Sequence, residues 1–153
     1  MASTAPITSS PAPEEGEATS TLSGARKPMS ALVVAHDPAL KQQLVQALAA
    51  MVEVGSVRGA HTLETGLVAI DGRMVDLLVA DLDLPEDGGP TLIRHARRRL
   101  AACKVLALAR PATAESRLPT ALHLGALGWL RMDEAQPTSG AEIAARIRQF
   151  LAD

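Results

Sequence analysis

The residues best suited to chemistry are two aspartates that follow a run of apolar side chains. Asp81 directly follows the stretch Asp76-Leu77-Leu78-Val79-Ala80, and Asp83 comes two residues later, before Pro85. A short apolar run of this kind is typical of a strand that is buried on both faces. We therefore expect Asp81 at the carboxyl end of a buried strand, where functional residues gather in an open parallel sheet.

The elements that must position Asp81 alternate regularly from residue 30 onward. Five apolar stretches predict strands, and they are Ala31–Ala35, Val52–Val57, Asp76–Ala80, Val105–Leu108 and Gly128–Arg131. Four of them are followed by a stretch with apolar residues at helical spacing, and the segment after Val105–Leu108 is less regular. Alternation of this kind favours an α/β fold with an open, doubly wound parallel sheet of five strands and five helices.

Local signals mark where several helices begin. Asp37 followed by Pro38 is typical of a helix N-cap with proline in the first turn, and Ser139 with Glu142 forms a capping box. Pro111 and Pro119 bracket the stretch after the fourth strand, so we expect a short helix there that starts late. We expect the last helix to pack its apolar residues inward, namely Ile143, Ile147, Phe150 and Leu151.

The first 29 residues differ in composition from the rest. They are rich in Ser, Thr, Ala and Pro, carry Glu14, Glu15 and Glu17, and have few large apolar side chains. Such a segment cannot bury enough surface to offset the entropy of ordering it. We predict a disordered tail over 1–29 and one folded domain over 30–153, with a regulatory arm as the alternative for the tail.

Composition also excludes several classes of function. Trp129 and Phe150 are the two aromatic residues and the formal net charge is −2, which argues against nucleic-acid binding. The single cysteine, Cys103, suits a small buried side chain in a cytoplasmic protein, and no apolar run is long enough to span a bilayer. The basic stretch Arg94–Arg99 is interpreted as a solvated helix end that complements the helix dipole.

Three stretches carry a resemblance to a known family. They are Leu32-Val33-Val34-Ala35-His36-Asp37-Pro38, Val75-Asp76-Leu77-Leu78-Val79-Ala80-Asp81-Leu82-Asp83-Leu84-Pro85 with Gly89, and Leu124-Gly125-Ala126-Leu127-Gly128-Trp129-Leu130. From about residue 30 to 153 the chain resembles the bacterial response-regulator receiver domains of two-component signalling. The last stretch resembles the receivers of helix-turn-helix regulators of the nitrate-response type. The resemblance implies a flavodoxin-like sheet with strand order 2-1-3-4-5.

The resemblance places Asp81 at the phospho-acceptor position. The residues that receivers use around this aspartate are replaced in this chain. Receivers hold Mg²⁺ with an acidic pair after the first strand, and here that pair falls on Ala35 and His36. The hydroxyl position after the fourth strand is Ala109, and the lysine position after the fifth is Met132, followed by Asp133 in place of proline. Mg²⁺ requires hard oxygen ligands, which these side chains do not supply.

These replacements predict a degenerate, or pseudo-, receiver with no enzymatic activity and no cofactor, which acts without phosphorylation of Asp81. One alternative is a working receiver, phosphorylated on Asp81 by a histidine kinase, whose metal is held by Asp37, Asp81 and Asp83. Another is a small-ligand sensor that uses the vacated pocket.

Three side chains near the pocket have open alternatives. His36 either forms an ion pair with Asp81 or faces solvent at a helix start, and Asp37 either caps the first helix or binds metal. Trp129 stands at the position of the receivers' switching aromatic residue, and we expect it to serve fixed packing or an interface.

We expect the partner to be a protein or a second copy of the chain, and neither membrane nor nucleic acid. The resemblance implies a contact surface formed by the fourth helix, the fifth strand Gly128–Arg131 and the fifth helix.

Overall fold

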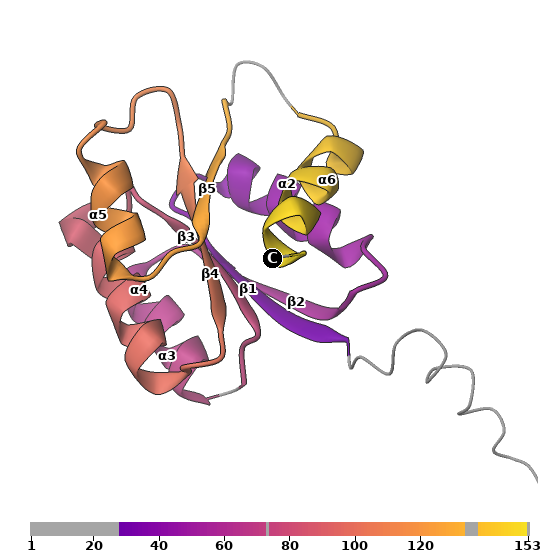
Figure 1. The fold of residues 1–153 in the computed structure, drawn as a ribbon, viewed down its shortest axis with the longest axis horizontal. Coiled ribbons are helices and arrows are strands. Elements are labelled where there is room, and N and C mark those ends of the chain that lie inside the picture. Colours follow the sequence, from indigo (N-terminus) through magenta and orange to yellow (C-terminus); the bar gives the residue numbers. More distant parts are fainter. Residues whose placement is uncertain (1–27, 73, 134–137, 153) are drawn as a thin grey trace, which may run out of the picture.

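The computed structural model describes residues 28–72, 74–133 and 138–152 and contains one parallel sheet with helices on both faces (Figure 1). The five strands lie in the order β2-β1-β3-β4-β5, which confirms the predicted doubly wound, flavodoxin-like sheet. The strands are β1 (Met29–Val34), β2 (Val54–Ala60), β3 (Leu77–Asp81), β4 (Lys104–Ala109) and β5 (Gly128–Arg131). The helices are α2 (Pro38–Ala49), α3 (Leu63–Gly72), α4 (Gly88–Arg99), α5 (Arg117–Leu124) and α6 (Gly140–Leu151), with a 3₁₀ turn, η2 (Pro85–Asp87), before α4.

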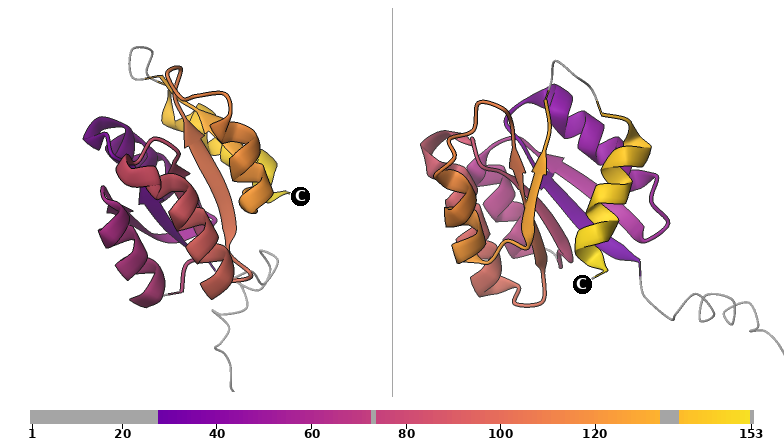
Figure 2. Two further views of the ribbon diagram at one scale, coloured as in Figure 1. Left: turned by 90° about the vertical axis from the view of Figure 1, so that its left-hand side faces the viewer. Right: turned by 45° about the horizontal axis from the view of Figure 1, so that its top comes forward.

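The helices divide the apolar core into two layers. α2 and α6 cover one face of the sheet, and α3, α4 and α5 cover the other (Figure 2). Strands β3 and β4 are buried along almost their whole length because helices cover them on both sides. This explains why the sequence shows continuous apolar runs there and not an alternating pattern.

The helix ends follow the predicted capping signals. The Asp37 carboxylate accepts hydrogen bonds from the backbone N–H groups of Ala39 (2.8 Å) and Leu40 (3.4 Å), so it is the N-cap of α2. The Ser139 hydroxyl likewise accepts from the N–H of Glu142 at 3.1 Å. The helix after β4 is short and begins only at Arg117, as predicted.

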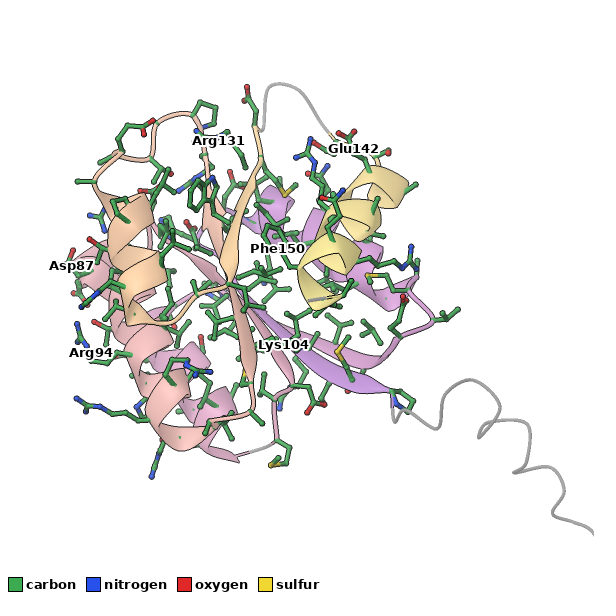
Figure 3. The ribbon with its side chains drawn as sticks, in the orientation of Figure 1. Asp87, Arg94, Lys104, Arg131, Glu142 and Phe150 are labelled. Carbon is green, nitrogen blue, oxygen red and sulfur yellow. The ribbon has the colours of Figure 1, made fainter. Side chains whose placement is uncertain are left out.

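The last helix packs on the sheet through a close contact at β5. Ile143 and Ile147 are buried, and Phe150 is partly buried on the α6 side of the sheet (Figure 3). The Phe150 ring lies where a side chain at Gly128 would otherwise project, so no larger residue fits at Gly128 without displacing the ring.

The second strand begins later than predicted. The N–H of Val54 bonds to the carbonyl of Met51 at 3.1 Å, which closes a turn where the sequence pattern predicted the strand's first residues. The Val52 side chain is 88% exposed and so does not belong to a buried strand. The first strand begins at Met29, so the predicted boundary between a tail over 1–29 and a domain over 30–153 was one residue too late. Residues 1–27 of the predicted tail lie outside the described residues. Within the described ranges, no helix is both long enough and apolar enough to span a bilayer.

Cys103 lies in the core between α4 and β4, as expected for a small apolar side chain, and burial raises the pKa of its thiol to about 11. Because the thiolate is the reactive form, we expect the native protein at pH 8 to resist Ellman's reagent and the protein in denaturant to react rapidly. The raised pKa also means that the fold favours the neutral thiol. Burial of the neutral thiol therefore adds to the free energy of unfolding in full below pH 9.0, the pKa of the thiol in the unfolded chain. This contribution declines as the pH rises toward 11. Rapid labelling of the native protein would contradict this account.

Candidate functional site at the end of the third strand

Asp81 ends the central strand β3 and is fully buried. Its Oδ2 accepts a hydrogen bond from the backbone N–H of His36 at 3.0 Å, and its Oδ1 accepts one from the N–H of Asp83 at 2.9 Å. The first donor comes from the loop after β1, which lies beside β3 in the sheet. Both carboxylate oxygens are therefore held by backbone amides of two adjacent loops.

An arginine supplies the positive charge of the site. Nη2 of Arg110 lies 3.8 Å from Oδ1 of Asp81 and 3.6 Å from Oδ2 of Asp83. The Arg110 side chain is only 17% exposed, so water screens these interactions less than it screens pairs at the surface. A guanidinium remains charged at every physiological pH. The chain thus places a permanent cation of its own between the two carboxylates.

A threonine fixes the loop that carries this arginine. The Thr113 hydroxyl accepts a hydrogen bond from the backbone N–H of Arg110 at 2.8 Å and donates one to Oδ2 of Asp83. Thr113 is itself buried, which is uncommon for a polar side chain and is explained by these two bonds. The sequence interpretation missed both Arg110 and Thr113 as site residues. The available signal was a threonine three residues after Arg110, a spacing that allows its hydroxyl to bond back to the backbone.

Close packing explains why residue 89 of the Asp81-x-x-x-Pro85-x-x-x-Gly89 motif is a glycine. A Cβ at Gly89 would lie 2.5 Å from the carbonyl oxygen of Asp81 and 2.8 Å from Cα of Leu82. The first turn of α4 therefore packs directly on the backbone that presents Asp81. Only glycine permits this approach.

The positions that the resemblance assigns to receiver chemistry contain packed apolar side chains. Ala35, Ala109 and Met132 are all buried in the core. Ala35 and Met132 belong to the layer under α2 and α6, and Ala109 belongs to the opposite layer. Trp129 on β5 is partly buried against that opposite layer.

The side chains of His36 and Asp37 do not interact with Asp81 in the ways left open by the sequence, which were an ion pair for His36 and a shared metal ion for Asp37. The His36 side chain is exposed, and His36 contacts Asp81 through its backbone N–H. Of the two alternatives for His36, the structure therefore shows the solvent-facing side chain and not the ion pair. The Asp37 carboxylate caps α2. No group of three or more His, Cys, Asp or Glu side chains in the described ranges could hold a metal ion, so the proposed set of Asp37, Asp81 and Asp83 is not assembled.

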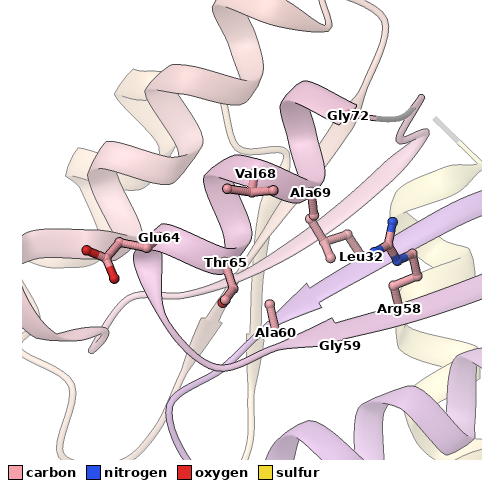
Figure 4. A pocket seen from close by; sticks show the side chains of 9 residues that line it. All are labelled: Leu32, Arg58, Gly59, Ala60, Glu64, Thr65, Val68, Ala69 and Gly72. Carbon is pink, nitrogen blue, oxygen red and sulfur yellow. The ribbon is translucent and has the colours of Figure 1, made fainter.

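Two cavities lie away from Asp81. One, of about 550 Å³, lies between β2 and α3 and is bordered by Arg58, Glu64 and Val68 (Figure 4). Another, of about 560 Å³, lies between α2 and α6. Neither is lined by Asp81, Asp83 or Arg110, so neither corresponds to a vacated receiver pocket.

Solved structures identify the fold. A CheY-like receiver domain from Methanospirillum hungatei matches with a TM-score of 0.69 and 21% identity, covering 82% of this chain and 95% of that one. The chain has the fold of response-regulator receiver domains. A putative response regulator from Chloroflexus aurantiacus matches with a TM-score of 0.67 and 26% identity, over 83% of this chain and 100% of that one. The receiver domain of the putative response regulator NarL from Mycobacterium tuberculosis matches with a TM-score of 0.67 and 20% identity, covering 81% of this chain and 96% of that one. No family model and no curated protein matches the chain.

The contacts of Arg110 predict a measurable coupling to Asp81. Replacing Arg110 with methionine keeps most of the aliphatic chain but leaves a buried carboxylate without its cation, so we expect a loss of about 1–3 kcal/mol in unfolding free energy. The same replacement in an Asp81→Asn background should cost clearly less, because the buried one of the two charges that Arg110 balances is gone. Urea denaturation measures the loss of unfolding free energy in both backgrounds. Arg131→Met, on the exposed end of β5, is the control. Equal losses in the two backgrounds would show that Arg110 does not balance Asp81.

Proposed function

We propose that this chain is a receiver-type signalling domain of the two-component class that acts through protein contacts and not through phosphorylation of Asp81. The observation that carries the proposal is the Arg110 guanidinium between Asp81 and Asp83. The atypical class and the likeness to nitrate-response receivers belong to the same proposal. They are supported by the sequence of Leu124–Leu130 and by the NarL receiver among the similar structures. A cytoplasmic, bacterial protein without enzymatic activity fits this proposal.

The surroundings of Asp81 oppose the formation of an acyl phosphate. Phosphoryl transfer requires positive groups around three phosphoryl oxygens and an attacking oxygen that the donor can reach. Both oxygens of Asp81 already accept backbone hydrogen bonds, and its side chain has no exposed surface. Arg110 is shared between two carboxylates, so the local charge stays negative before any phosphate arrives.

The residues of the site also do not fit a magnesium ion. Mg²⁺ requires near-octahedral oxygen ligands and retains several waters. Near Asp81 the acidic-pair positions are a buried alanine and a histidine whose side chain faces solvent. The guanidinium of Arg110 brings a fixed positive charge within 4 Å of both Asp81 and Asp83, where a second cation would be repelled.

An experiment with beryllofluoride tests the proposal. This phosphoryl analogue forms a stable adduct with receiver aspartates in the presence of Mg²⁺, and we expect none here by ¹⁹F NMR. Acetyl phosphate should likewise add no phosphoryl mass. A typical receiver serves as the positive control and Asp81→Asn as the blank. Stoichiometric modification of Asp81 would refute the proposal and favour the phospho-acceptor alternative.

The proposed contact surface comprises α5, β5 and α6. Leu122 on α5 and Leu127 before β5 are both exposed although apolar, which supports a partner on this side. If the partner is a second copy, Leu127→Asp should weaken self-association at least about tenfold, because burying an aspartate in an apolar contact is costly. Val68→Asp on α3 is the matched control, since Val68 is exposed on a different helix. Sedimentation velocity over a concentration series gives the result, and an equal effect of both variants would contradict this surface.

A further inference from the structure

Arg117 at the start of α5 reaches across to the loop that follows Asp81. Its Nη1 donates a hydrogen bond to the carbonyl of Leu82 at 3.1 Å, and its Nη2 lies 3.6 Å from Oδ1 of Asp87. Leu82 is the residue after Asp81, and Asp87 ends the 3₁₀ turn before α4. A single side chain therefore connects α5 to both ends of this loop.

The loop has an unfavourable backbone conformation. Glu86 (φ 62°, ψ 33°) and Asp87 (φ 56°, ψ 34°) both lie in the left-handed region, although neither is glycine. In that region the Cβ of an L-residue crowds the following carbonyl, and two such residues in succession are uncommon. Such a conformation persists only where surrounding contacts hold it.

The amino end of α5 depends on contacts of this kind. The helix has only eight residues, and its N-cap residue, Ser116, makes no side-chain capping bond. Its carboxyl end is better held. There, Gly125 adopts φ 118° and its N–H bonds to the carbonyls of Ala121 and Leu122. The first turn of α5 therefore has no side-chain cap, and Arg117 connects it to the loop after Asp81.

We propose that Arg117 is a clasp that holds the strained turn and the amino end of α5 together, and that its release changes the position of α5. The Arg117 and Asp87 side chains are 34% and 79% exposed, so the ion pair is weak and open to competition. The relief of strain at Glu86 and Asp87 favours release, while the two Arg117 contacts oppose it. By changing the position of α5, Arg117 would regulate the α5 side of the partner surface without phosphate. This role rests on the proposed function.

Native-state hydrogen exchange tests the clasp. Arg117→Met keeps the aliphatic part of the side chain and removes both polar contacts, so we expect about tenfold faster exchange of the α5 amides. Exchange in α2, on the opposite face, should not change. Arg94→Met is the matched control, because Arg94 is an exposed arginine on the neighbouring helix α4 without a polar partner among the described residues (Figure 3).

A second variant tests the strain itself. Glu86→Gly removes the crowded Cβ while keeping the Arg117 contacts, so exchange of α5 should slow severalfold. Combined with Arg117→Met, it should bring α5 exchange back toward the wild-type rate. Unchanged α5 exchange in Arg117→Met, or an equal change in α2 and α5, would overturn the clasp. Beryllofluoride uptake by Asp81 would instead refute the proposed function and leave the clasp measurements unaffected.

Discussion

The site is organised around a carboxylate with no exposed surface at the end of the central strand. A buried charge costs several kcal/mol unless hydrogen bonds and an opposite charge balance it. Asp81 receives two backbone N–H groups from neighbouring loops and the guanidinium of Arg110. Strand register makes this possible, because Asp81 pairs with Leu108 and thereby brings the end of β4, and with it Arg110, beside the end of β3.

The loops around this carboxylate follow from the same requirement. Thr113 bonds to the Arg110 backbone and to Asp83, so the segment after β4 turns toward the acidic loop before it enters α5. Arg117 adds contacts to Leu82 and Asp87 from the first turn of that helix. On the other side, Gly89 lets α4 pack on the Asp81 backbone. Polar side chains after β4 thus contact the loop after β3 at several points.

The identity of the cation determines how such a site can be regulated. A metal ion can leave and return, and a lysine can move to meet a phosphate. The guanidinium of Arg110, mostly buried and shared between Asp81 and Asp83, belongs to the chain and cannot leave the site. The side chains of Ala35, Ala109 and Met132 are buried and carry neither an oxygen ligand nor an amine. Under the proposed function, such a site would leave regulation to contacts at the surface, including those that depend on the position of α5.

The sequence by itself determined the sheet, because buried parallel strands require continuous apolar runs and helices require a different period. It also determined the caps at Asp37 and Ser139, which depend on neighbours only two or three residues away. It placed Asp81 at a strand end and showed which expected partners were replaced. The predicted start of β2 at Val52 was wrong. A turn over Met51–Val54 occupies the residues whose types favour a strand, so the strand begins only at Val54. Only the tertiary structure identified Arg110, Thr113 and Arg117, since each lies about 30 residues from the acidic residues that it contacts. Strand register and loop closure bring these groups together, and no local pattern of residue types records that arrangement.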